Sequence, residues 1–259
     1  ILMHEAAYHS IVETDRIDLH RSVGLALEDL YPEQKERLAP QLAHHFLITN
    51  DTKKAYQYLD LAGHASMDAF ATAEAEVYFA RAITQTTDPE QLAHLYIELG
   101  EARAQQGNHR QAVHAWNKAI DYLERFNDPD RLARTYARSA RSAWWGYTPQ
   151  YSLEICLRGM KAIEGAKESP DIAYLIHETG RAYFFNDQPD KARAFSEQSL
   201  EMAQRLGAAE VQAGALATIG VLPTTSPEQA VEAGSYTHLR AHETLRHLVC
   251  RLLLEKKNT

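Results

Sequence analysis

Residues 96–119 read YIELGEARAQQGNHRQAVHAWNKA, which is the pattern of two amphipathic helices joined by a tight turn. The first helix carries a small residue, Gly100, and the second carries Ala112 twelve positions later. Two helices can cross closely only where the side chains between them are small, and Gly107-Asn108 supplies the turn. The stretch therefore predicts a helical hairpin whose two helices meet at these small residues.

The same hairpin recurs along the chain with a period of about forty residues. Turn residues such as Thr148-Pro149 again separate the two helices of a unit. Gly and Pro are otherwise sparse and β-branched runs are absent, so we expect an all-α fold without a sheet. The recurring small residues are Gly100, Ala140, Gly180 and Gly220 in the first helices, and Ala112, Ser152 and Ala192 in the second helices.

Each unit resembles the tetratricopeptide repeat. Around Gly100 the matching residues include Tyr96, Trp116 and Ala119, and an earlier unit is centred on Gly63. The resemblance implies a right-handed α-α superhelix of stacked helical hairpins. Its helices should be longer than usual, because the standard period is about 34 residues.

Composition and charge disfavour several classes of protein. The formal net charge of −8 disfavours nucleic acid as a partner, since phosphate binding needs clustered Lys and Arg. The two cysteines, Cys156 and Cys250, suggest neither a metal clip nor a disulfide framework, which favours a reducing, cytoplasmic environment. No run approaches the ~18 apolar residues of a membrane helix, so we expect no membrane contact.

Motifs for catalysis or for a bound cofactor are absent from the sequence. His4 and His9 are five residues apart and diverge by about 140° on a helix, so they do not form a zinc-binding pair. There is no phosphate-binding Gly-x-x-x-x-Gly-Lys-Ser/Thr motif. Cys156 falls at a packing position, and Asp128 reads as a helix cap or a solvated side chain. We therefore expect no catalytic residue, no metal site and no cofactor.

The first 85 residues carry a second pattern. It contains a helix with Glu5 and Tyr8, followed by the run 42–46, LAHHF, and later by Ala62-Gly63. This order resembles the junction after the nucleotide-binding module of large bacterial signalling ATPases of the STAND type. The resemblance implies an effector domain (a nucleotide cyclase, a protein kinase or a LuxR-type DNA-binding domain), then the ATPase, then a tetratricopeptide array that senses or scaffolds. The family's Phe-x-His element would fall before residue 1, so we expect a piece of a longer protein.

The repeat pattern stops near residue 234. SYTHLRAHET, residues 235–244, and LVCRLLLEK, residues 248–256, resemble translated sequencing-adapter DNA read in one frame. The alternative is a basic amphipathic tail. We expect three parts: a helical junction over 1–35, the repeat array over 36–234, and a non-native tail over 235–259.

In tetratricopeptide proteins, certain positions of the first helices line the concave surface, which we call the inner face. Counted from the small residue, they lie three before it and one, four and five after it, and Arg134 and Tyr174 stand six before their small residues. Arg and aromatic residues at such positions are typical of binding hot spots, and paired arginines indicate a carboxylate-bearing peptide or an acidic segment of the same protein as ligand. The residues expected on the inner face are Arg134, Arg141, Trp144, Tyr174, His177, Arg181 and Phe184.

Packing is the alternative role for the aromatic residues. The pairs Trp144-Trp145 and Phe184-Phe185 could fill the space between long helices, with one ring of each pair buried and the other exposed.

The sequence as a whole favours binding over catalysis. We expect a protein- or peptide-binding sensor or scaffold region that works with ATPase and effector domains of the same protein. One alternative is a passive oligomerisation spacer whose inner surface is filled by its own helices or by a second copy. Another is a fragment of a nucleotide cyclase that lacks its catalytic domain.

Overall fold

The computed structural model describes residues 8 and 10–222, and within these residues it contains helices and no strand. The pair His4 and His9, the whole of the expected tail and the end of the expected array lie outside the described residues. The chain divides into two compact units, residues 1–122 and 123–259, and each is described by itself.

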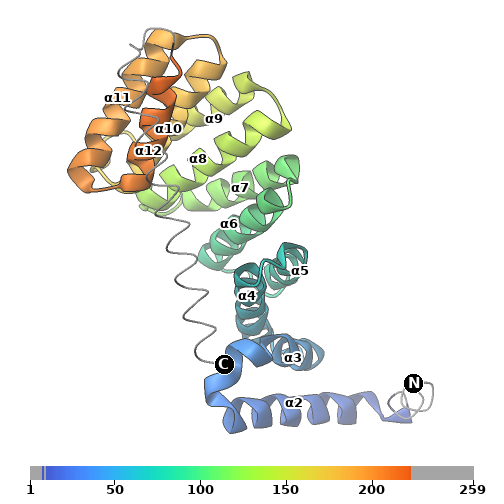
Figure 1. Cartoon of the computed structure of the whole chain (residues 1–259). Helices are drawn as coiled ribbons and strands as arrows, with labels where there is room; N and C mark the ends of the chain where they lie inside the picture. The colour runs from blue at the N-terminus through green and yellow to red at the C-terminus, as the bar shows by residue number, and fades with distance from the viewer. Residues whose placement is uncertain (1–7, 9, 223–259) are drawn as a thin grey trace. The chain divides into compact units, whose positions relative to one another are not determined.

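Between residues 13 and 105, the first unit contains five α-helices and one short 3-10 helix, and the boundary helix α7 follows (Figure 1). Successive helices pack on one another from α2 to α6. Between α2 and α3, His20 Nδ1 lies 2.8 Å from His45 Nδ1, so the two rings share a hydrogen bond between helices. The segments are α2 Glu13–Leu30, the short 3-10 helix η1 Pro32–Gln34, α3 Lys35–Ile48, α4 Thr52–Asp68, α5 Thr72–Ile83, α6 Pro89–Gln105 and α7 His109–Leu123.

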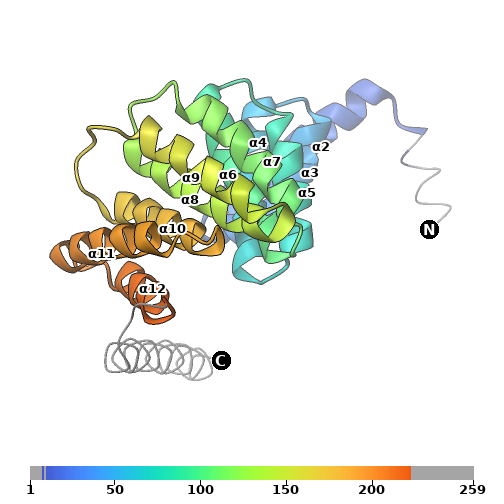
Figure 2. The ribbon, with the colours of Figure 1, turned by 90° about the horizontal axis from the view of Figure 1, so that it is seen from above.

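Up to residue 222, the second unit contains two helical hairpins followed by a further first helix (Figure 2). In each hairpin the two helices pack together, and α10 also packs on α8 of the preceding hairpin and on α12. The helices are α8 Pro129–Gly146, α9 Pro149–Ala162, α10 Pro170–Phe185, α11 Pro189–Leu206 and α12 Ala209–Gly220.

Small residues lie where the two helices of a hairpin cross, as the sequence predicts. A Cβ atom on Gly100 would lie 2.5 Å from Nε1 of Trp116, and that indole donates a hydrogen bond to the carbonyl of Ile97 at 3.2 Å. A Cβ atom on Gly180 would lie 2.7 Å from the Ser196 hydroxyl. Because interiors are close-packed, these crossings leave no room for a larger side chain.

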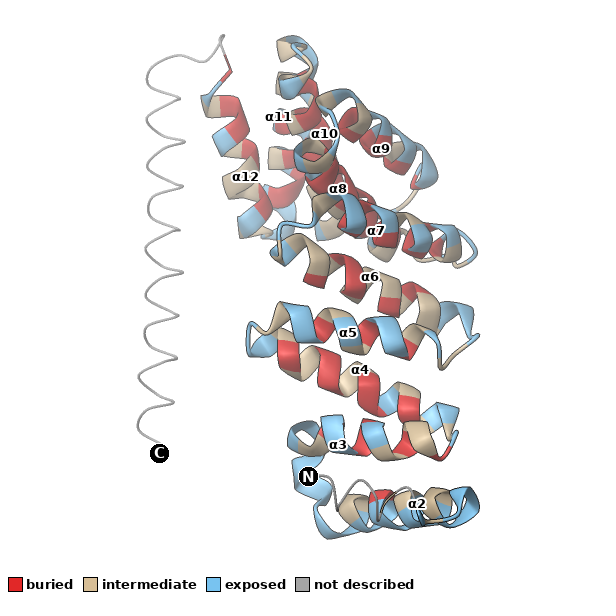
Figure 3. Cartoon of the chain, turned by 90° about the vertical axis from the view of Figure 1, so that its right-hand side faces the viewer, coloured by how far each residue is buried: buried red, intermediate tan, exposed pale blue. Residues whose placement is uncertain are grey.

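The middle hairpin closes in a different way, with Ala140 and Ser152 at the crossing. The Ser152 hydroxyl donates a hydrogen bond to the Ala140 carbonyl at 2.7 Å, in the buried interior. The polar second residue is therefore satisfied within the contact, which removes most of the cost of burying a hydroxyl. Figure 3 shows the result along both units: buried residues follow the helix faces turned toward neighbouring helices.

Helix ends follow the turn residues of the sequence. Thr148 accepts a hydrogen bond from the backbone N–H of Tyr151 and caps α9, and Pro149 occupies its first turn. Asp128 caps α8 in the same way through Arg131 N–H. Gly107 has φ of 78°, a left-handed conformation that glycine adopts at little cost. The prediction of an all-α fold built from tetratricopeptide-like hairpins is confirmed.

No helix among the described residues combines the length and the apolar character that crossing a bilayer requires.

Candidate functional site

Three arginines form one row along α8 in the second unit. Arg134, Arg138 and Arg141 follow one another at spacings of four and three residues, which places them on the same side of a helix. The equivalent row on α10, one repeat later, consists of Tyr174, Glu178 and Arg181.

The two rows are joined by an arginine–glutamate network, which we define as Arg141, Glu178 and Arg181. Arg141 donates from Nε and Nη2 to Glu178 Oε1, at 3.0 and 2.7 Å. Arg181 donates from Nε to Oε2 at 2.9 Å, and its Nη2 lies 2.8 Å from the same oxygen. Each carboxylate oxygen of Glu178 is thus held by a different arginine, and one net positive charge remains on the network.

Glu178 is a buried carboxylate, with 1% of its surface exposed. Burial alone would raise the pKa of Glu178, but the positive charges of Arg181 and Arg141 outweigh it and hold the pKa below its ordinary value. The side chain is therefore ionised at neutral pH. The two arginines are bound to it, so they are not two independent cations as the sequence alone suggested.

The pairing follows a constant offset between neighbouring first helices. Arg141 binds Glu178, which lies 37 residues later in the sequence. Arg134 Nε donates to Asp171 Oδ1 at 2.6 Å, again over a separation of 37 residues. The small residues of neighbouring first helices are forty positions apart, three more than this separation. Each arginine therefore contacts the next first helix about one turn before the position equivalent to its own. The offset explains why Glu178 was missed: it lies at none of the positions counted for the inner face.

A cavity of about 350 Å³ opens beside this network, between α8, α10 and the start of α12. Positive and negative groups both line it, together with the ring of Tyr174. Burial raises the pKa of Tyr174 to about 12, with the charge of Glu178 acting in the same direction, so the phenol stays protonated and can donate a hydrogen bond. The lining includes Arg134, Arg138, Asp171, Tyr174, Glu210 and Val211.

Aromatic rings extend the site along α8 and α10. The guanidinium of Arg181 lies 5.9 Å from the Trp144 ring centre and 5.8 Å from that of Phe185, within the range of a cation–π contact. Trp144 and Phe185 are themselves 4.4 Å apart between ring centres. Phe185, rather than Phe184, therefore joins this cluster, and Phe184 touches it through Phe185 at 5.2 Å.

Neither aromatic pair divides into one buried and one exposed ring. Trp144 and Phe184 are half-buried, whereas Trp145 is 64% exposed and Phe185 is 37% exposed. The α8 and α10 helices therefore end in a partly open aromatic surface.

His177 lies inside the unit, not on the inner face. It is 3% exposed, and its Nε2 lies against Gly214 of α12, where a Cβ atom would come within 2.7 Å. Burial lowers the pKa of His177 to about 4, so the ring is neutral at pH 7 and its 3.8 Å approach to Glu178 is no ion pair. The sequence prediction placed His177 among residues open to a ligand, and the close approach of α12 is the reason that it is covered.

Solved structures of known proteins, including the following two, are similar to the chain. One is a signal transduction ATPase with numerous domains (STAND) from Pyrococcus horikoshii that has a tetratricopeptide repeat sensor, with a TM-score of 0.63 and 15% identity. The match covers 88% of this chain and 38% of that protein. The other is BtubC from P. vanneervenii, with a TM-score of 0.57 and 13% identity, covering 90% of this chain and 93% of that one.

No protein-family model and no curated protein sequence matches the chain. At identities this low, the two structural matches show the fold alone, which is that of a tetratricopeptide repeat protein.

Proposed function

We propose that the chain is a protein- or peptide-binding sensor or scaffold region, and that its second unit binds a carboxylate-bearing segment in the cavity between α8, α10 and α12. The observation that carries the proposal is that cavity, with Arg134 and Tyr174 in its lining. Arg donors and an aromatic ring together supply directional hydrogen bonds and contact area, the combination typical of binding hot spots.

The mixed charge of the cavity limits the ligands that fit. Arg134 binds Asp171 through Nε and has further guanidinium N–H groups, which together with Arg138 can donate to a carboxylate, while Glu210 offers an acceptor to a backbone N–H or an amine. A peptide with an acidic side chain or a free carboxyl terminus satisfies both kinds of group. A purely anionic ligand would leave Glu210 facing like charge, which costs free energy.

The aromatic cluster at Trp144 and Phe185 supplies a second contact for the same peptide. Trp145 presents 64% of its surface to solvent beside it, a large apolar area for a ligand side chain to cover. The separation of charged and aromatic contacts along α8 and α10 suits an extended segment more than a compact metabolite.

Binding in place of catalysis agrees with the chemistry of the described residues. Cys156 is completely buried, and burial raises the pKa of its thiol far from the range of a nucleophile. Glu178, the buried carboxylate of the site, is held ionised by two arginines and has no proton to donate.

A parent protein of the STAND signalling type is the context that we propose, in the cytoplasm of a bacterium. The support is the resemblance of the first 85 residues together with the structural match to a STAND protein of which this chain covers 38%. In that setting, a peptide bound in the second unit would bias contacts between the repeat array and the ATPase.

A display selection of peptides on the full chain tests this function. Enriched peptides should be acidic, and fluorescence anisotropy should show that Arg134→Gln weakens their binding at least about tenfold, the equivalent of one lost charge-assisted hydrogen bond. Arg205→Gln is the matched control, because Arg205 also pairs with a carboxylate, Glu168, but lies on α11 outside the cavity.

Equal binding by both variants would refute the cavity as the site. A chain that enriches no peptide but self-associates in light scattering would instead favour the oligomerisation spacer.

A further inference from the structure

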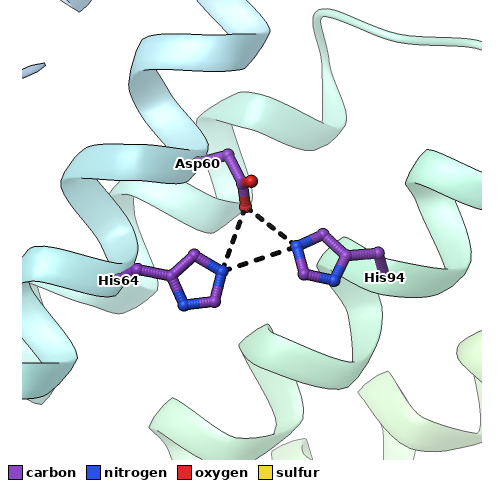
Figure 4. Close-up of side chains that lie close together, drawn as sticks. All are labelled: Asp60, His64 and His94. Carbon is purple, nitrogen blue, oxygen red and sulfur yellow. Dashed lines mark hydrogen bonds and ion pairs between the residues drawn. The ribbon is translucent and has the colours of Figure 1, made fainter.

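Three potential metal ligands converge in the first unit. Asp60 and His64 lie one turn apart on α4, and His94 reaches toward them from α6 (Figure 4). His94 Nε2 is 3.1 Å from Asp60 Oδ1, His64 Nε2 is 3.6 Å from the same oxygen, and the two Nε2 atoms are 3.5 Å apart. We propose that Asp60, His64 and His94 bind a divalent transition-metal ion of the zinc type.

The spacing of the three donor atoms fits such an ion. Zinc binds histidine nitrogen and carboxylate oxygen at about 2.0–2.2 Å, so two ligand atoms at angles between about 90° and 120° lie roughly 3.0–3.6 Å apart. The three distances in the structure are 3.1, 3.5 and 3.6 Å. A point about 2.0 Å from all three atoms therefore exists, so one ion can reach all three donors.

Proton bookkeeping also favours a cation at this point. One Nε2–H can donate to Asp60 Oδ1, and His94 is the better placed ring at 3.1 Å. The Nε2 of His64 is left with two long contacts: it either accepts a share of the His94 N–H at 3.5 Å or points its own N–H at Asp60 Oδ1 from 3.6 Å. A metal ion accepts all three lone pairs at once.

The ligand types select the class of metal. Imidazole suits zinc, copper, nickel and iron, whereas magnesium and calcium prefer oxygen ligands alone. Two histidines and one carboxylate leave further coordination positions for water or for a group of a bound partner. The three side chains are between 23% and 42% exposed, so solvent can reach those positions.

Packing holds the rings in place. The ring of His64 meets the edge of Phe79 with 5.4 Å between ring centres, and Phe79 is completely buried. His94 stacks beside His64 at 5.5 Å, with 29° between the ring planes. A ligand set that is already oriented loses little conformational freedom on binding, which raises affinity.

Within its own unit, this cluster occupies repeat positions equivalent to those of the second unit's first-helix rows. Asp60 and His64 lie three before and one after Gly63, and His94 lies six before Gly100. In the second unit, the last two of these positions carry Arg141 and Tyr174, whose guanidinium and ring are 5.8 Å apart. The metal would thus link two successive first helices on the inner face of the first unit.

Zinc titration of the full chain, freed of metal by chelator dialysis, tests the proposal. Calorimetry should show that the chain binds one saturable equivalent of Zn²⁺. The variants His64→Gln, His94→Gln and Asp60→Asn should each lower the zinc affinity at least about tenfold, because substituting even the residues that hydrogen-bond to metal ligands lowers affinity by that much. Zn²⁺ should also raise the unfolding temperature of the unsubstituted chain and not that of these variants.

His114→Gln is the matched control, because His114 is an exposed histidine of α7 in the same unit. It should leave the zinc affinity unchanged within about twofold, which separates the proposed site from weak binding to the thirteen histidines of the chain. Far-UV circular dichroism checks that each variant folds.

Cobalt provides a readout that does not depend on a histidine variant folding. Co²⁺ added to the unsubstituted chain should give a visible absorption band that Asp60→Asn shifts or removes, because the carboxylate belongs to the coordination sphere. Absence of a saturable equivalent of Zn²⁺, its survival in both histidine variants, or an identical cobalt band in Asp60→Asn would overturn the proposal.

Discussion

Replacing Arg181 by methionine should destabilise the second unit by about 2–3 kcal/mol. The arginine holds one oxygen of the buried Glu178 with two nitrogens, at 2.9 and 2.8 Å. A hydrogen bond to a charged group contributes about 1.5–3 kcal/mol, whereas a buried charge left without any partner costs about 3–5 kcal/mol. Because Arg141 still binds the other carboxylate oxygen of Glu178, the expected loss of stability lies below the cost of a buried charge without any partner.

Urea unfolding at pH 7, followed by circular dichroism and by tryptophan fluorescence, measures this loss. Trp144 and Trp145 report on the second unit, and Arg181 lies over the ring of Trp144. Arg205→Met is the control: Arg205 and Glu168 are 55% and 50% exposed, so removing their ion pair should cost under about 1 kcal/mol.

Acid unfolding should change in the same variant, and the sign follows from the lowered pKa of Glu178. The ionised side chain contributes stability above its unfolded pKa of about 4.5, and this contribution is lost as the pH falls through the lower pKa of the folded state. Arg181→Met removes the largest influence that lowers this pKa, so acid destabilisation should begin at higher pH.

Adding Glu178→Gln should then recover part of the stability, because a neutral amide needs no countercharge. If Arg181→Met costs no more than Arg205→Met, and Glu178→Gln rescues nothing, the account of a buried carboxylate held by arginine is refuted.

Two further substitutions test the helix crossing and the buried histidine. Gly100→Ala should lower the free energy of unfolding by about 1–3 kcal/mol in chemical denaturation, since the new Cβ atom would meet Trp116 Nε1 at 2.5 Å. An unchanged denaturation midpoint would mean that the two helices can move apart to accommodate a methyl group. His177 has its pKa lowered to about 4 from 6.5, so its neutral form is favoured by folding and stability should fall as the pH drops from 6.5 to 4. His177→Asn should flatten stability across that window, and a profile parallel to that of the unsubstituted chain would contradict the burial argument.

The fold was predictable because its cause is local and repeats. A small residue recurs in the first helices and lies at a close crossing at Gly63, Gly100 and Gly180, and Ala140 meets Ser152 at another. The turn residues are also local signals: Thr148 and Asp128 cap the helices that follow them.

The candidate site was only partly predictable, because its partners depend on how neighbouring helices are offset. The register aligned Arg141 with Arg181, but no periodicity places Glu178 between them; that requires the one-turn shift between α8 and α10. Helix rotation of about 100° per residue decides whether Phe184 or Phe185 meets Trp144. The burial of His177 depends on α12, which arrives from the next repeat.

The three side chains of the proposed metal site form no compact motif in the sequence. A search for two histidines four residues apart passes over Asp60 and His64, which pair a carboxylate with an imidazole at that spacing. His94 lies 34 residues after Asp60. The local repeat, from Gly63 to Gly100, is 37 residues, so this pair too is about one helical turn short of the repeat length. The constant offset between first helices is the signal that would have joined them.

That constant offset has a consequence for how such arrays diversify. Each neighbouring pair of first helices displays its own small set of side chains, as histidine and aspartate in the first unit and arginine and glutamate in the second. A few substitutions on two helices can exchange one recognition chemistry for another while every hairpin keeps its packing residues. Ligand preference can therefore change in one part of the array without lowering the stability of the other repeats.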